Sequence, residues 1–260
     1  MFANKCYAKV WDDQTKVIKE RLNRSLKISV SKKNEDGSYT QEFNGFVKLL
    51  DDAATKVVLK DEKGYNNSIQ LLNVGVTSTY NKEKQEKNVN CYVTAFNNST
   101  GANSGVSKTS RKNPLWGWTF TNGAYARVWE VTQNEKGKTI ARITISGKKG
   151  DGYVTYFNDY VQVSDGVTVT ENSTIKIESC GTRNWYNKEN KKTYWTFYVF
   201  KATPVTDATE PDFDNVIPPE EVITEFGMDF PFAGDDENEI FDNENTSDVI
   251  MGNGEDLPFK

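Results

Sequence analysis

The 260-residue chain contains no histidine. Histidine is the base of Ser-His-Asp and Cys-His triads and a frequent metal ligand, so its absence excludes those triads and all histidine metal sites. The cysteines, Cys6, Cys91 and Cys180, are odd in number and far apart. This pattern is typical of reduced core thiols rather than of disulfides or a zinc site. We expect no metal, no cofactor and no enzymatic activity.

Long apolar runs are also missing. No run approaches the ~18 residues of a membrane-spanning helix, and residues 1–5 (MFANK) contain no apolar signal core. Hydrophobic residues make up only 36%, although aromatic residues reach 12%, which is ample for a packed fold. We therefore expect a soluble, cytoplasmic protein with no membrane partner, folded over only part of its length.

The chain has few prolines before residue 204: Pro114 is alone there, and the other six lie within residues 204–260. The same boundary divides the charge. Residues 204–260 hold 17 Asp or Glu and one Lys, a formal charge of −16, which leaves +11 on residues 1–203. The last segment also lacks Trp and Tyr, so it cannot bury enough apolar area to offset its ordering entropy. We predict a disordered acidic tail at 204–260.

The first 203 residues contain one pattern twice. Six segments recur in the same order, at separations between 104 and 118 residues, and chance similarity would not stay collinear over six segments. The matching segments are 6–11 and 124–129, 28–31 and 143–146, 36–37 and 151–152, 43–47 and 157–161, 80–83 and 186–189, and 92–96 and 196–200. We expect one domain at 1–98, a linker at 99–118 and a second domain at 119–203.

Within each copy the pattern is that of β-strands. Leu26, Ile28 and Val30 alternate with polar residues, and turn signals such as residues 34–37 (NEDG) separate the strands. Strands are expected at about 5–11, 25–31, 42–50, 69–76 and 89–96, with equivalents in the second copy. Five strands in ~90 residues favour an all-β fold of two tandem OB-fold, five-stranded Greek-key barrels. Residues 51–63 could hold a short helix.

The first strand of each copy has two contrasting faces. Small apolar residues point one way, and Tyr7, Lys9 and Trp11 point the other; Tyr125, Arg127 and Trp129 repeat this in the second copy. Bases stack on aromatic rings at ~1–3 kcal/mol each and cations neutralise phosphates, so the outward set suits single-stranded nucleic acid. The alternative is that both tryptophans cap the barrel ends as part of the core.

The third strand adds Phe46, Lys48 and Tyr160 on its more polar face. Alternation places Phe43 and Phe157 on the opposite face, towards the core. The fifth strand of the second copy, residues 194–200, is aromatic on both faces and cannot be oriented from the sequence.

Three segments resemble bacterial single-stranded-DNA-binding (SSB) proteins. Residues 182–199 (TRNWYNKENKKTYWTFYV) resemble the family's hairpin of strands four and five, residues 157–161 (FNDYV) its third strand, and residues 256–260 (DLPFK) its acidic tail tip. The resemblance covers essentially the whole chain. It implies sequence-tolerant binding and protection of single-stranded DNA in replication, recombination and repair, in a bacterial or phage-encoded form.

The resemblance implies that Trp185 and Phe157 stack on bases, with Tyr160 as the alternative to Phe157. It also implies that the tail tip recruits replication and repair proteins through Asp256, Leu257, Pro258 and Phe259. With the repeated strands, the candidate DNA-binding residues are Tyr7, Lys9, Trp11, Lys27, Phe43, Phe46, Lys48, Tyr80, Tyr125, Arg127, Trp129, Arg142, Phe157, Tyr160, Arg183, Trp185 and Tyr186.

Two other functions fit the same residues. A protein-interaction or scaffold module would explain the tail but not the repeated aromatic and cationic strand. A binder of single-stranded RNA or of oligosaccharides would use the same barrel face. Residues 76–79 (VTST) stand where the second copy has TRNW, so the first copy is expected to bind more weakly. A homodimer and a monomer are equally compatible with the sequence.

Overall fold

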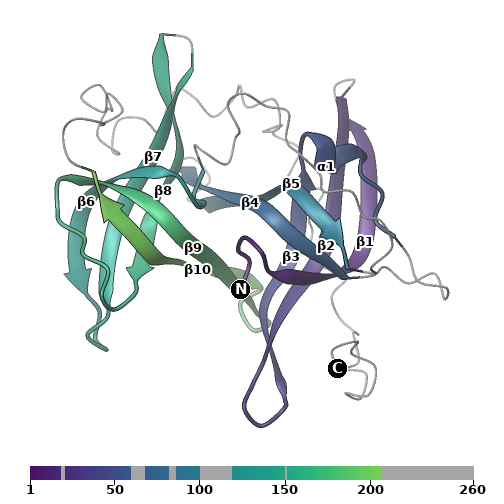
Figure 1. The fold of residues 1–260 in the computed structure, drawn as a ribbon, viewed down its shortest axis with the longest axis horizontal. Helices are drawn as coiled ribbons and strands as arrows, with labels where there is room; N and C mark the ends of the chain where they lie inside the picture. The colour runs from purple at the N-terminus through teal and green to yellow at the C-terminus, as the bar shows by residue number, and fades with distance from the viewer. Residues whose placement is uncertain (19–20, 60–67, 82–85, 100–118, 150, 206–260) are drawn as a thin grey trace.

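The computed structural model describes residues 1–18, 21–59, 68–81, 86–99, 119–149 and 151–205, and these form an almost entirely β-stranded fold (Figure 1). The strands are β1 (Tyr7–Ile18), β2 (Arg21–Lys33), β3 (Tyr39–Leu49), β4 (Ser68–Asn81), β5 (Glu86–Asn98), β6 (Tyr125–Gln133), β7 (Thr139–Lys149), β8 (Gly152–Val163), β9 (Ser173–Asn187) and β10 (Lys192–Pro204). The short helix α1 (Asp52–Thr55) lies within the stretch expected to hold one. The all-β prediction is confirmed.

Residues 100–118 and 206–260 lie outside the described residues. They include nearly all of the expected linker and tail, and with them the expected tip Asp256, Leu257, Pro258 and Phe259. The domain boundaries drawn from the sequence stay a prediction.

Both sets of five strands pair in the same order. β1, β2 and β3 form an antiparallel meander, β3 then runs parallel to β5, and β4 joins β5 to β1 and so closes the barrel. β6, β7, β8, β10 and β9 repeat this order, with β9 returning to β6. This order, with one parallel pair, is that of the five-stranded Greek-key barrel of the OB type. We call the two units the first and second barrels.

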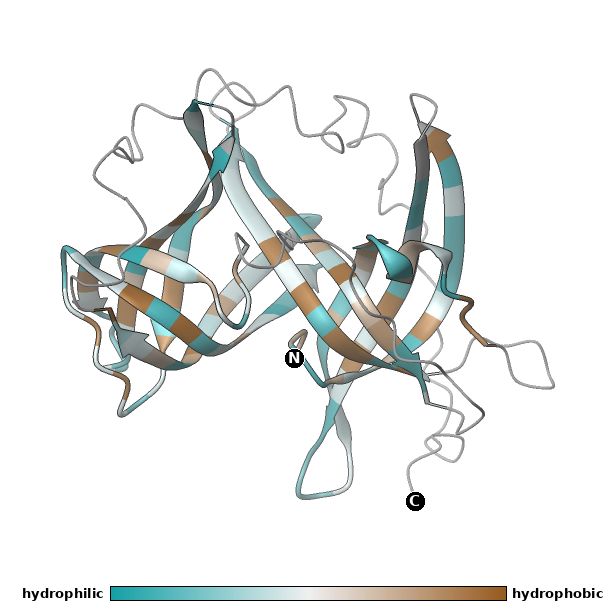
Figure 2. Cartoon of the chain, turned by 45° about the horizontal axis from the view of Figure 1, so that its top comes forward, coloured by the Kyte–Doolittle hydropathy of each residue, from teal (hydrophilic) through white to brown (hydrophobic). Residues whose placement is uncertain are grey.

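The barrel interiors are built by the alternation that the sequence shows. Ala8 and Val10 of β1 point inwards and are buried, as are Ala126 and Val128 of β6. Apolar and polar residues accordingly alternate along the strands in Figure 2. Small inward residues suit the narrow interior of a five-stranded barrel, where larger side chains from the facing strands fill the remaining space.

A β-bulge follows the inward residues in each first strand. Val10 pairs with Ile28 and Asp12 with Lys27, so Trp11 is the extra residue. In the second barrel Val128 pairs with Ile143 and Glu130 with Arg142, so Trp129 is the extra residue. A bulge redirects a side chain and bends its strand. Both tryptophans keep the outward side that alternation gives them, and the alternation shifts at the next residue, because Asp12 and Glu130 lie opposite the outward Lys27 and Arg142.

The segment before each barrel pairs with the other barrel. Phe2 exchanges two backbone hydrogen bonds of 2.9 Å with Thr182 of β9. The backbone N–H of Phe120 donates to the carbonyl of Val76 in β4 at 2.9 Å. Thr182 and Val76 occupy equivalent positions in the two copies, 106 residues apart. The two barrels are thus joined by a pseudo-two-fold exchange of N-terminal segments.

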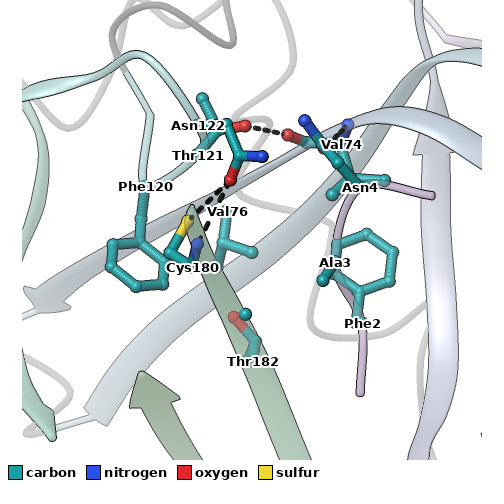
Figure 3. A pocket seen from close by; sticks show the side chains of 11 residues that line it. Phe2, Ala3, Asn4, Val74, Val76, Phe120, Thr121, Asn122, Cys180 and Thr182 are labelled. Carbon is teal, nitrogen blue, oxygen red and sulfur yellow. Dashed lines mark hydrogen bonds between the residues drawn. The ribbon is translucent and has the colours of Figure 1, made fainter. Parts of the chain in front are cut away.

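Asparagine side chains hold both segments in place. Asn4 Oδ1 accepts the backbone N–H of Val74 at 3.0 Å, and Asn122 Oδ1 accepts that of Cys180 at 3.2 Å. Figure 3 shows both contacts beside a small pocket between the barrels, with Phe2 and Phe120 on either side of it. The pocket is part of the joint between the barrels, because the exchanged segments themselves form its walls.

Candidate functional site

The outer surface of β1, β2 and β3 carries the predicted residues of the first barrel. Lys9 lies opposite Ser29, which lies opposite Asn44; in the next row Lys27 lies opposite Phe46, and Lys48 follows on β3. We define the first face by the residues Lys9, Trp11, Lys27, Ser29, Asn44, Phe46 and Lys48. Side chains in neighbouring rows of one sheet face lie within reach of one another. The strand pairing therefore unites five of the predicted residues on one surface.

Trp11 is exposed and held in place. Its indole Nε1 donates to Ser29 Oγ at 2.8 Å, and Lys9 Nζ lies 4.2 Å from its ring centroid. Lys27 Nζ lies 5.9 Å from the ring centroid of Phe46. Trp11 is 46% exposed, so the alternative that it caps the core is wrong. An indole fixed by a hydrogen bond loses little further freedom when a flat ligand stacks on it.

The second barrel repeats this arrangement. Trp129 Nε1 donates to Thr144 Oγ1 at 2.9 Å, and the guanidinium of Arg127 lies 5.9 Å from the Trp129 ring centroid. Arg142 lies opposite Tyr160, which is 48% exposed. We define the second face by Arg127, Trp129, Arg142, Thr144, Asn158 and Tyr160. Trp129 and Arg127 are half-buried, so neither is sealed in the core.

Tyr7 and Tyr125 lie beside these faces, next to the fourth strand of each barrel. Tyr7 is exposed and pairs with Gln70, while Tyr125 pairs with Lys176. Lys176 Nζ lies 5.7 Å from the Tyr125 ring centroid. Both tyrosines extend the alternation of ring and cation along the first strand.

The β9–β10 hairpin carries a pair of stacked rings. The rings of Trp185 and Tyr194 lie 4.5 Å apart at 14° to one another, and their side chains are 54% and 40% exposed. Tyr186 is also exposed, and so is Tyr80 at the equivalent place on β4. Sequence reasoning missed Tyr194. The signal was its position across the hairpin from Trp185, which puts both rings on one side.

The predicted base contacts of Phe43 and Phe157 are wrong, because both side chains are fully buried. Phe43 stacks on Phe2 at 4.8 Å between centroids, and Phe157 stacks on Phe120 at the same distance. The exchanged segments thus cover both rings. Alternation had placed them in the core, and Tyr160 is the aromatic residue of β8 that faces outwards.

Arg183 supports the joint between the barrels. It forms an ion pair of 2.9 Å with Glu42 of β3, whose carboxylate also lies 3.7 Å from the N-terminal ammonium of Met1. Burial lowers the pKa of that ammonium, while Glu42 opposes the shift. We therefore assign Arg183 a docking role in addition to any contact with a ligand.

Other types of site find little support in the described part of the chain. It contains no group of three or more His, Cys, Asp or Glu side chains arranged to hold a metal ion. Burial raises the pKa of the Cys91 and Cys180 thiols, which disfavours the thiolate needed for nucleophilic chemistry. Among these residues no helix has the length and apolar character to span a membrane.

Two solved structures of the single-stranded DNA binding protein from Thermus aquaticus are similar to this chain. The wild-type protein matches with a TM-score of 0.43 at 8% identity, over 79% of this chain and 93% of its own. A deletion mutant of the same protein matches with a TM-score of 0.41 at 8% identity, over 79% and 95% of the two chains. No family model matches the chain, and no curated protein matches it.

Proposed function

We propose that this protein binds single-stranded DNA with little sequence preference and catalyses no reaction. The observation that carries the proposal is the repetition, on two barrels, of an outward Trp held by a hydroxyl acceptor with a cation two residues before it. A hydrophobic core does not require this arrangement, and exposed aromatic residues are costly unless a ligand covers them. Rings that stack on bases and cations that neutralise phosphates are what an unpaired strand requires.

The net charge supports the same ligand. Residues 1–203 carry a formal charge of +11. Single-stranded DNA that contacts several protein cations releases its counterions, so binding should weaken steeply as the salt concentration is raised. The resemblance of residues 182–199 to the SSB hairpin agrees with this proposal. We extend it to protection of single strands in replication, recombination and repair in a bacterial or phage-infected cytoplasm, with the tail tip recruiting partner proteins and dimerisation bringing four barrels together.

Titration of the intrinsic Trp fluorescence with oligo-dT, oligo-U and duplex DNA tests the ligand class. We expect quenching by oligo-dT that high salt reverses, because Trp11, Trp129 and Trp185 would stack on bases. The variant K9A/R127A should bind more weakly and with a shallower salt dependence, since two phosphate contacts are lost. The matched control K136A removes an exposed cation from the turn between β6 and β7 and should behave as the wild-type protein.

Each other outcome selects a different function. Quenching by oligo-U of equal or greater affinity would replace the DNA proposal with an RNA-binding one. Absence of quenching and of any ligand-induced change with all three nucleic acids would leave the protein-interaction module as the better interpretation.

A further inference from the structure

We infer, resting on the proposed function, that the protein binds single strands on two unequal composite tracks, each formed by the face of one barrel and the hairpin of the other. The first track joins the first face to the β9–β10 hairpin. The second track joins the second face to the paired ends of β4 and β5. The first track should bind more tightly, and Trp185 and Tyr194 should determine the difference.

The docking of the β9–β10 hairpin on β3 defines the first track. Asn184 Oδ1 accepts the backbone N–H of Asn44 at 2.9 Å, and Asn184 Nδ2 donates to the Asn44 carbonyl at 3.0 Å. The Asn184 side chain thus pairs with the backbone N–H and carbonyl of Asn44, as a neighbouring strand would. This contact lies before Lys48, where the pairing of β3 with β5 begins. Trp185 directly follows Asn184 in β9. Its backbone therefore lies beside the row of the first face that contains Asn44, Ser29 and Lys9.

The second track is built by the equivalent contact in the opposite direction. Ser78 of β4, the counterpart of Asn184, pairs with Phe157 of β8. Its Oγ donates to Asp159 Oδ2 at 2.7 Å, and Lys87 Nζ lies 2.7 Å from the same carboxylate oxygen. Asp159 is buried while the Lys87 side chain is 44% exposed, so the two contacts hold a buried carboxylate of the second barrel against the end of the β4–β5 pair. In Figure 1, β4 and the β9–β10 pair lie on the sides of their barrels that face one another.

Among the cross-strand pairs that differ between the two hairpins, one carries two stacked and exposed rings in the second barrel only. Trp185 lies opposite Tyr194 in the β9–β10 hairpin, whereas Thr79 lies opposite Asn88 at the same place between β4 and β5. A stacked pair of rings offers a ready surface for a base, and neither Thr nor Asn does. The faces add to the inequality, because Lys48 on the first face has Gln162 as its counterpart. The richer hairpin and the additional cation thus belong to the same track.

Exchanging the two pairs tests the inequality. The readout is the fluorescence anisotropy of a labelled oligo-dT of about 10 nucleotides, a length suited to one barrel. The wild-type protein should show a tight and a weak binding event. W185T/Y194N should weaken the tight event about 10-fold, which corresponds to about 1.4 kcal/mol. T79W/N88Y should strengthen the weak event by a similar factor, and a gain of affinity cannot result from misfolding.

Double-mutant cycles test which face each hairpin serves. W185T/Y194N should be non-additive with K9A on the first face and additive with R142A on the second, because groups that contact one ligand couple. Additivity with K9A together with coupling to R142A would show that each hairpin contacts DNA bound to its own barrel. This result would overturn the composite tracks. Two equal binding events unchanged by either pair would overturn the inequality. Absence of oligo-dT binding by the wild-type protein would instead overturn the proposed function itself.

Discussion

Each tryptophan at the bulge is held by a hydrogen bond while its side chain stays partly exposed. The hydrogen bonds from Trp11 to Ser29 and from Trp129 to Thr144 satisfy the indole N–H without placing it in the core. A cation on the preceding outward residue lies against each ring. Because the acceptor is a hydroxyl in both barrels, Ser at one position and Thr at the other preserve the same contact.

Replacing Phe157 or Tyr160 singly with alanine should distinguish a residue of the core from a residue that contacts the ligand. F157A should lower the free energy of unfolding by about 3–5 kcal/mol, because the ring is buried between Phe120 and Phe197, with centroids 4.8 and 5.0 Å away. Y160A should leave stability nearly unchanged and lower oligo-dT affinity by about 1–3 kcal/mol. Urea unfolding and anisotropy measure the two effects. The opposite pattern would restore Phe157 as the base-stacking residue.

Alternation predicted most side-chain orientations correctly, and its one conflict with the family resemblance was decided by contacts outside the strand. Phe43 and Phe157 point inwards as alternation required, but what covers them is Phe2 and Phe120. Those residues lie 41 and 37 positions earlier in the chain. No local period reports contacts over that separation, so the sequence could not show that these rings are closed to a ligand.

At the scale of elements, the segments before β1 and β6 are as important as the strands. Each begins with a Phe that stacks inside one barrel and pairs with a strand of the other. Each contains a left-handed residue two positions before its strand, Lys5 at φ 67° and Gly123 at φ 88°. Glycine adopts this conformation without strain and lysine does not, which indicates that the turn geometry is needed in both copies.

Removing the asparagine of either segment should loosen the joint between the barrels. N4A and N122A should each lower the free energy of unfolding by about 1–3 kcal/mol, because the backbone N–H of Val74 or Cys180 loses its acceptor. The control N88A changes an exposed residue of β5 and should shift stability by less than about 0.5 kcal/mol. Thermal unfolding followed by circular dichroism measures all three. Losses no larger than that of N88A would contradict the assigned role.

The fifth strand shows where repeat matching loses accuracy. The matching of segments 92–96 and 196–200 implies a separation of 104 residues. The pairing with the fourth strands gives 106 instead, since Cys91 lies opposite Val76 and Phe197 opposite Thr182. Because the error is two residues, every side chain keeps its side of the sheet. The same strand is aromatic on both faces, so only its pairing partners could orient Tyr194.

The whole molecule is a fused pseudo-dimer. Its two barrels exchange equivalent segments and equivalent hairpins, as the subunits of an isologous dimer would. The sequence predicted two similar barrels because the repeat is collinear. It did not predict the exchange, because the two hairpins dock on the opposite barrels through different residue types. One contact joins Asn184 to Asn44, and the other joins Ser78 to Asp159. Divergence of the two hairpins is what makes the two proposed tracks unequal.

The charge of the whole chain leads to the last prediction. Residues 1–203 carry +11 and residues 204–260 carry −16, so we expect the acidic segment to compete with DNA for the basic surface of the same chain. A chain ending at Val205, one residue after β10, should bind oligo-dT more tightly than the full chain at low salt. The difference should shrink as the Debye length falls from about 10 Å at 0.1 M to about 3 Å at 1 M salt.

Anisotropy titrations of both chains across that salt range measure the effect. A full-length variant with every Asp and Glu after Val205 changed to Asn or Gln is the matched control, because it keeps the length and removes the charge. If charge causes the competition, this variant should bind as the truncated chain does. If it binds as the wild-type protein does, the added chain rather than its charge would be responsible. Equal affinities of all three proteins at low salt would show that the acidic segment does not compete for the two faces.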